Sequence, residues 1–209
     1  MTPDLERAKT YVFDRLGHEL SSQLTYHSLH HTRDDVLPAA IHLGQQSGLD
    51  DALLVLLATA ALYHDTGFIY HYHNHEDESI AIAQATLPEF GYDGEQIRQI
   101  AGMIAATKMP QRPRTKLDEL LCDADLDLLG RKDFWRLNRN LLIETRRYIE
   151  PTLSEAKWLK EQCVFLADHS YFSGAAHLLR DEGKIFNLTM MRQALVSLNG
   201  DGHAAPHDR

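Results

Sequence analysis

A histidine and an aspartate stand side by side at the end of the most apolar segment of the sequence. His64 and Asp65 follow the run DALLVLLATAALY (residues 51–63), whose pattern predicts a helix buried on nearly every side. An imidazole and a carboxylate are costly to bury unless they pair with each other or bind a metal ion. The doublet therefore predicts either a metal site or a buried His–Asp hydrogen bond that holds the end of the helix.

Two further segments supply side chains that could complete a metal site. YHSLHHT (residues 26–32) opens an amphipathic helix, and LCDADLD (residues 121–127) alternates carboxylates with apolar residues late in another helix. On a helix Asp123 and Asp127 share a face, whereas Asp125 points elsewhere. Three aspartates interleaved with leucines are not the pattern of an exposed helix face, so at least one of them should point inward.

The motifs YHSLHHT, LYHDTG, HEDES and DADLDLLG, in this order, resemble those of the HD superfamily of metal-dependent phosphohydrolases. The resemblance covers residues 25–131 and implies a helical bundle of the HD-domain type with additional C-terminal helices. In that family the last aspartate follows a small residue, which selects Asp125 and leaves Asp123 as the second candidate. The metal ligands implied by the resemblance are His31, His64, Asp65 and Asp125.

The implied ligand set has a definite chemistry. Two neutral imidazoles and two carboxylates balance a dication and leave coordination positions open, which suits Mn, Mg, Fe, Co or Ni. Such an ion makes a bound water more acidic and draws charge from a phosphoryl oxygen. The resemblance thus implies that His64 and Asp65 belong to the catalytic centre.

Residues after the doublet bear on the number of metals and on the substrate. His75 resembles the third histidine of two-metal HD enzymes, but the next expected histidine is replaced by Thr107 and Lys108. This favours one ion per chain, with His75 as a pocket residue or partial second-site ligand. We expect Lys108 either to contact the substrate phosphate or to complement the end of its helix. His27 or His30 could orient a ligand or replace His31.

The elements that must position these residues are all predicted to be helical, because helical periodicities follow one another and strand patterns are weak. We expect an all-α bundle forming one HD-type domain over residues 1–198, and a disordered tail over 199–209. The half after residue 131 could complete the bundle, cap the pocket or form a homodimer interface. The predicted helices span residues 3–16, 31–46, 51–65, 76–87, 93–107, 115–129, 133–149, 152–168, 171–181 and 188–198.

Composition narrows the partners and the compartment. A net charge of −9 argues against a basic face for nucleic-acid polymers. The N-terminus lacks an apolar signal core, and the longest apolar run, residues 52–63, is shorter than the roughly 20 residues that span a bilayer. Cys122 and Cys163 show no metal-ligand spacing and suit buried, reduced thiols. We expect a soluble cytoplasmic protein with no membrane partner.

These observations lead to one main functional hypothesis and two alternatives. The main hypothesis is metal-dependent hydrolysis of a phosphate ester or anhydride in a small, nucleotide-like substrate. One alternative is a non-catalytic regulatory module that binds a metal or a nucleotide in the same pocket. The other is an iron-dependent oxygenase of the same fold, which Thr107 in place of a histidine disfavours.

Overall fold

All regular secondary structure in residues 2–200, the part of the chain that the computed structural model describes, is helical. This confirms the predicted all-α fold class. Short 3₁₀ turns at Thr66–Ile69, Leu87–Phe90 and Asp127–Gly130 and a π-helical turn at His31–Val36 join longer helices. The α-helices are α1 (Leu5–Glu19), α2 (Leu37–Gln46), α3 (Asp51–Tyr63), α4 (His75–Thr86), α5 (Gly94–Thr107), α6 (Lys116–Asp125), α7 (Phe134–Tyr148), α8 (Glu155–Asp168) and α9 (Gly174–Gly200).

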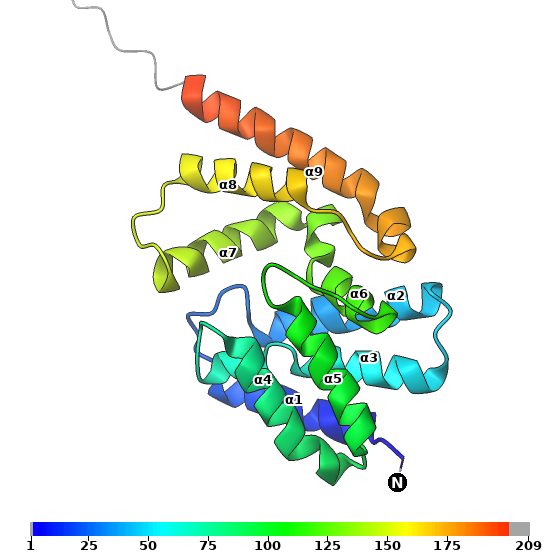
Figure 1. Cartoon of the computed structure of the whole chain (residues 1–209). Coiled ribbons are helices and arrows are strands. Elements are labelled where there is room, and N and C mark those ends of the chain that lie inside the picture. Colours follow the sequence, from blue (N-terminus) through cyan, green and yellow to red (C-terminus); the bar gives the residue numbers. More distant parts are fainter. Residues whose placement is uncertain (1, 201–209) are drawn as a thin grey trace, which may run out of the picture.

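Helix α3 lies at the centre of the site-bearing half of the fold. It begins where the Asp50 side chain accepts a hydrogen bond from the Leu53 N–H, and its last eight residues are buried. Helices α1, α2, α5 and α6 pack around it (Figure 1). The stretch Asp51–Ile69 is long and apolar enough to cross a membrane, but 72% of its most apolar 18-residue window is buried inside the fold. The burial of this stretch is explained by its place in the core of the fold.

Helices α7, α8 and α9 form a second layer beside this half (Figure 1). α9 packs against α8 and against the 3₁₀ turn Asp127–Gly130 that follows α6. One cluster of buried apolar side chains extends from Ala8 in α1 to Met191 in α9. The segment after residue 131 therefore completes the helical bundle, which is one of the three roles left open by the sequence.

Two predicted helices differ from the structure near the candidate site. The helix predicted over residues 31–46 begins as the π-helical turn, and Pro38 lies in the first turn of α2, where its missing N–H costs nothing. The helix predicted over 115–129 ends at Asp125, before a separate 3₁₀ turn. π-helical turns often accompany functional sites, and here the turn begins at His31.

The largest difference is at α9, which is one helix where two, over 171–181 and 188–198, were predicted. Gly183 lies between the two predicted helices, yet the observed helix runs through it without a break. A glycine is needed at this position because a Cβ would stand 2.0 Å from the Gly130 carbonyl oxygen. The two backbones meet too closely for any side chain. The predicted tail over 199–209 lies outside the described residues from 201 onward, and residues 199 and 200 end α9.

This close approach gives a stability prediction. Gly183→Ala should lower the free energy of unfolding by about 1–3 kcal/mol, because the new methyl group must push α9 away from the turn at Gly130. Gly102→Ala on α5 is the matched control: nothing lies within 4 Å of its Cβ position, and the added helix propensity should stabilise by about 0.5–1 kcal/mol. Urea denaturation followed by circular dichroism measures both. Equal effects of the two substitutions would contradict this explanation.

Candidate metal centre

The His64-Asp65 doublet terminates α3 in a defined orientation. The Thr66 hydroxyl donates a hydrogen bond to the Tyr63 carbonyl at 2.8 Å and so closes the helix end. Nδ1 of His64 lies 2.8 Å from the Ala61 carbonyl oxygen. Since a carbonyl can only accept, Nδ1 carries a proton and the other ring nitrogen, Nε2, is left for the interior. A histidine held in this way presents Nε2 as a ligand.

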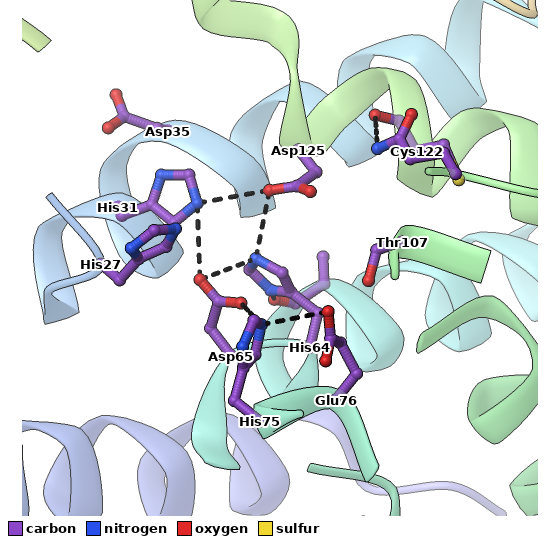
Figure 2. A network of polar contacts seen from close by, with 12 residues as sticks. His27, His31, Asp35, His64, Asp65, His75, Glu76, Thr107, Cys122 and Asp125 are labelled. Atoms are coloured by element: carbon purple, nitrogen blue, oxygen red, sulfur yellow. Dashed lines mark hydrogen bonds and ion pairs between the residues drawn. The ribbon is translucent and has the colours of Figure 1, made fainter. Parts of the chain in front are cut away.

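The structure brings four side chains together around Nε2 of His64. Their atoms form a ring in Figure 2, in which the two imidazoles alternate with the two carboxylates. Asp65 Oδ2 lies 3.2 Å from His64 Nε2 and 3.6 Å from His31 Nε2. Asp125 Oδ1 lies 3.6 Å from His64 Nε2 and 3.4 Å from His31 Nε2. The π-helical turn, the end of α3 and the end of α6 therefore converge on one point.

These spacings fit a metal ion better than a hydrogen-bonded cluster. Both ring nitrogens of His31, Nε2 of His64 and Oδ2 of Asp65 are buried without a hydrogen-bond partner in the described chain. With bonds of about 2.1 Å to a divalent ion, neighbouring ligand atoms stand about 3.0–3.4 Å apart. Ligand atoms of His31, His64 and Asp65 lie within 4.8 Å of one another, as a shared ion requires. These side chains could hold a metal.

The charges of the ring favour a cation. Burial disfavours a charged Asp65, but the neighbouring His64 and His75 outweigh it and hold the pKa of Asp65 well below its usual range. The pKa of Asp125 is also lowered, because His31 and His64 outweigh its burial. Burial likewise opposes protonation of His64, yet the two carboxylates raise its pKa well above the usual range. A divalent metal ion would replace that proton, so metal binding should release protons.

The second oxygen of Asp65 faces another group of side chains. Asp65 Oδ1 lies 3.3 Å from His75 Nε2, which is 3.7 Å from the buried carboxylate of Glu76. The approach of α4 depends on Gly67, where a Cβ would stand 1.9 Å from the His75 carbonyl oxygen. The Gly67 N–H donates to the Ser79 hydroxyl at 2.8 Å. The glycine of LYHDTG and the serine of HEDES thus bring His75 beside Asp65.

A His–Glu pair stands at the side of the ring. His27 lies next to His31 in Figure 2, with ring centroids 5.7 Å apart. Nδ1 of His27 contacts a carboxylate oxygen of Glu144, and the other oxygen accepts the backbone N–H groups of Tyr26 and His27. Burial opposes protonation of His27, but Glu144 outweighs it and raises the pKa of His27. Phe68 stacks against this imidazole at 4.4 Å.

Glu144 and Glu76 are the site residues that sequence reasoning missed. Glu144 lies on α7, in the half of the chain without a recognisable motif, and is fully buried. Its signal was its position seven residues after Leu137 and three after Leu141, on the apolar stripe of the helix. Tyr72 also donates a hydrogen bond to Glu144 and stacks on Tyr148. Helix α7 therefore closes one side of the site.

Comparison with solved structures shows which type of fold the chain has. No protein-family model and no curated protein matches the sequence. Among solved structures, a predicted HD superfamily hydrolase from an uncultured Thermotogales bacterium matches with a TM-score of 0.64 and 18% identity, covering 94% of each chain. The chain has the HD-type fold. At this identity the likeness establishes the fold alone, and it supports the resemblance on which the expected ligands were chosen.

Within the HD-type fold, the two candidate aspartates of DADLDLLG lie in different surroundings. Asp125 joins the ring of ligands, whereas the buried Asp123 carboxylate accepts the N–H groups of Phe172 and Ser173 at 2.8 Å each. Asp123 thereby holds the segment before α9 against α6. The geometry favours Asp125 over Asp123 as the fourth ligand.

Three other predicted residues make contacts outside the ring of ligands. Lys108 Nζ donates to Asp77 at 2.8 Å and is partly exposed. The hydroxyl of the buried Thr107 donates to the Ile104 carbonyl. His30 is 75% exposed at its side chain and pairs with Asp34, so it does not take the place of His31.

The different roles of the two aspartates can be tested by matched substitutions. Asp123→Asn should lower the free energy of unfolding by about 1–3 kcal/mol, because an amide can accept only one of the two N–H groups and presents a donor to the other. It should leave metal content unchanged. Asp125→Asn should do the reverse, losing metal with little loss of apo-protein stability. Metal analysis and denaturation of both variants test these roles. Metal loss in Asp123→Asn but not in Asp125→Asn would make Asp123 the ligand.

Proposed function

We propose that this protein is a metal-dependent phosphohydrolase that cleaves a phosphate ester or anhydride of a small, nucleotide-like molecule. The observation that carries the proposal is the convergence of four side chains whose buried ring nitrogens and carboxylate oxygen lack hydrogen-bond partners in the described chain. The structural neighbour is itself described as a predicted hydrolase of the HD superfamily, which supports the reaction class.

The proposed ligands of one divalent ion, Mn, Mg, Fe, Co or Ni, are His31, His64, Asp65 and Asp125. When bound, such an ion acidifies a water molecule and withdraws charge from a phosphoryl oxygen. The protein contributes orientation, because the Ala61 carbonyl fixes the His64 ring. Asp65 keeps its other oxygen toward His75. Because that oxygen can only accept, His75 carries its proton on Nε2 and orients Asp65 beside the ring.

His27 is the proposed proton donor to the leaving oxygen. Glu144 holds Nδ1, so the second nitrogen of a protonated His27 is free to donate. Phe68 helps to keep this imidazole in place, since its ring stacks on both His27 and His75, with centroids 4.4 Å and 3.8 Å away. A carboxylate that stabilises the charged imidazole and fixes its orientation is the arrangement that general acid catalysis requires.

Lys108 is the proposed contact for a substrate phosphate at the rim of the site. It would exchange its ion pair with the exposed Asp77 for one with the phosphate, and an ion pair at an exposed position is easily given up. The buried, free thiols of Cys122 and Cys163 are consistent with a reducing compartment, and we propose a cytoplasmic location.

The experiment is a panel of phosphate monoesters, diesters and nucleotides incubated with protein loaded with Mn, Mg, Co, Ni or Fe. We expect metal-dependent release of phosphate or nucleotide that chelation with EDTA abolishes. Metal-loaded protein that turns over no member of the panel would favour the regulatory module. Oxygen consumption by the iron form in place of hydrolysis would favour the oxygenase.

A further inference from the structure

The outward face of α9 carries a regular stripe of exposed side chains. Six residues recur at alternating intervals of four and three, and all six are exposed. The apolar members Leu178, Ile185 and Val196 are 90%, 63% and 71% exposed. We call this set the α9 stripe: Leu178, Glu182, Ile185, Thr189, Arg192 and Val196.

The stripe faces away from the fold. Asn187 and Met191, on the opposite face of α9, are buried in the bundle. Figure 1 shows α9 at the outer edge of the molecule, beside α8. In the described part of the chain, neither Glu182 nor Arg192 takes part in an ion pair or a side-chain hydrogen bond. Apolar and unpaired charged groups thus share one open surface.

Alternation of four and three residues is the spacing of a coiled-coil seam, in which one helix packs along another. From residue 178 to residue 196 the seam is about 27 Å long. Two copies of α9 placed antiparallel, with a two-fold axis at residue 187, bring together residues whose numbers add to 374. Leu178 then meets Val196, Ile185 meets Thr189, and Glu182 meets Arg192 of the other copy.

This register makes the α9 stripe complementary to itself. Both apolar ends are covered, and the two symmetric Glu182–Arg192 pairs supply the charge partners that the chain itself does not. A parallel pair would instead place Glu182 against Glu182 and Arg192 against Arg192, which repel. Leu179 and Phe186, 38% and 62% exposed, add apolar surface along one edge of the stripe.

We propose that a second copy of this chain covers the α9 stripe, and that the two α9 helices form an antiparallel, two-fold symmetric pair. Such an interface is isologous, with the same patch on both subunits. In Figure 1 α8 lies between α7 and the C-terminal part of α9, and none of the stripe residues belongs to the ring of ligands. Dimer formation and metal binding can therefore be tested separately.

The test is sedimentation equilibrium of the full-length protein over a wide range of concentrations. We expect a reversible dimer. Glu182→Arg and Arg192→Glu should each raise the dissociation constant at least about tenfold, since each creates two like-charge pairs across the axis. The double variant Glu182→Arg/Arg192→Glu should restore dimerisation, because both pairs are re-formed with their signs exchanged. Arg139→Glu, an exposed charge reversal on α7, should change nothing.

Rescue by the double variant is the decisive outcome, because only the antiparallel register places residue 182 against residue 192. A monomer at every concentration would overturn the proposal. A dimer that ignores both single reversals, or that the double variant fails to restore, would overturn it equally. Circular dichroism verifies that each variant keeps the helical fold. Ile185→Asp gives an independent check, since it should also dissociate the dimer.

Discussion

Asp65→Asn should abolish metal binding and lower hydrolysis by at least about 10³-fold. The amide keeps the shape of the side chain but removes the charge from the atom that faces both His31 and His64. It also removes the charge that faces His75. Lewis-acid stabilisation by a metal ion is worth several kcal/mol, and each 1.4 kcal/mol corresponds to a factor of ten in rate.

The readouts for this variant are the metal content and kcat/KM under saturating metal. His30→Ala is the matched control, because this histidine next to His31 is exposed and its side-chain partners among the described residues are Arg33 and Asp34 of the adjoining turn. It should retain both metal and activity. Wild-type turnover by Asp65→Asn would show that the ring of ligands is not the reaction centre.

His27→Gln should lower kcat by about 10²–10⁴-fold, because a general acid usually contributes a factor of this size. The metal should stay in place. The loss should depend on the leaving group. An alkyl phosphate, whose leaving oxygen needs a proton, should show the full effect, whereas a 4-nitrophenyl ester should show much less. A structural role for His27 would slow both substrates equally, and that result would contradict the proposal.

The pH dependence follows from the Glu144 partner. Activity that requires protonated His27 falls as pH rises through the raised pKa of this residue. Glu144→Gln removes the negative charge, so the pKa of His27 should drop and the alkaline limb of the pH–rate profile should move to lower pH. An alkaline limb that stays in place in Glu144→Gln would contradict the role of the pair.

The same pair has a stability window of definite sign. The pKa of His27 is raised, so its contribution is complete below the ordinary value of 6.5 and is lost as pH rises through the folded pKa. The pKa of Glu144 is lowered because His27 outweighs its burial, so its contribution is complete above the ordinary value of 4.5 and is lost as pH falls through the folded pKa. The two contributions overlap at mildly acidic to neutral pH.

Much of the fold was predictable because helices are encoded locally. The apolar run of α3, its Asp50 cap and the glycine after the doublet predicted the central helix, and periodicity predicted its neighbours. The continuity of α9 was not predictable, since Gly183 is explained by Gly130, more than fifty residues away in sequence. The π-helical turn at His31 likewise leaves no pattern that distinguishes it from an α-helix.

Some residues of the candidate site were also predictable from the sequence, and others were not. His31, His64, Asp65 and Asp125 were chosen from motifs, and the structure brings them within 3.2–3.6 Å of one another around the ring. Glu144 reaches His27 across 117 residues. Its place on the apolar stripe of α7 indicates that it is buried, but no local pattern shows that His27 is its partner. Asp123 and Asp125 could be separated only when the backbone groups that Asp123 binds were known.

The most direct test of a metal centre in this fold is equilibrium metal binding to the purified, chelator-stripped chain. Titration with Mn²⁺, followed by calorimetry and by metal analysis of the bound fraction, should show one tightly bound ion per chain and release of protons. Asp125→Ala should lose that ion and His30→Ala should keep it. A wild-type chain that binds no divalent ion, or an Asp125→Ala variant that binds as tightly as wild type, would contradict the proposed centre.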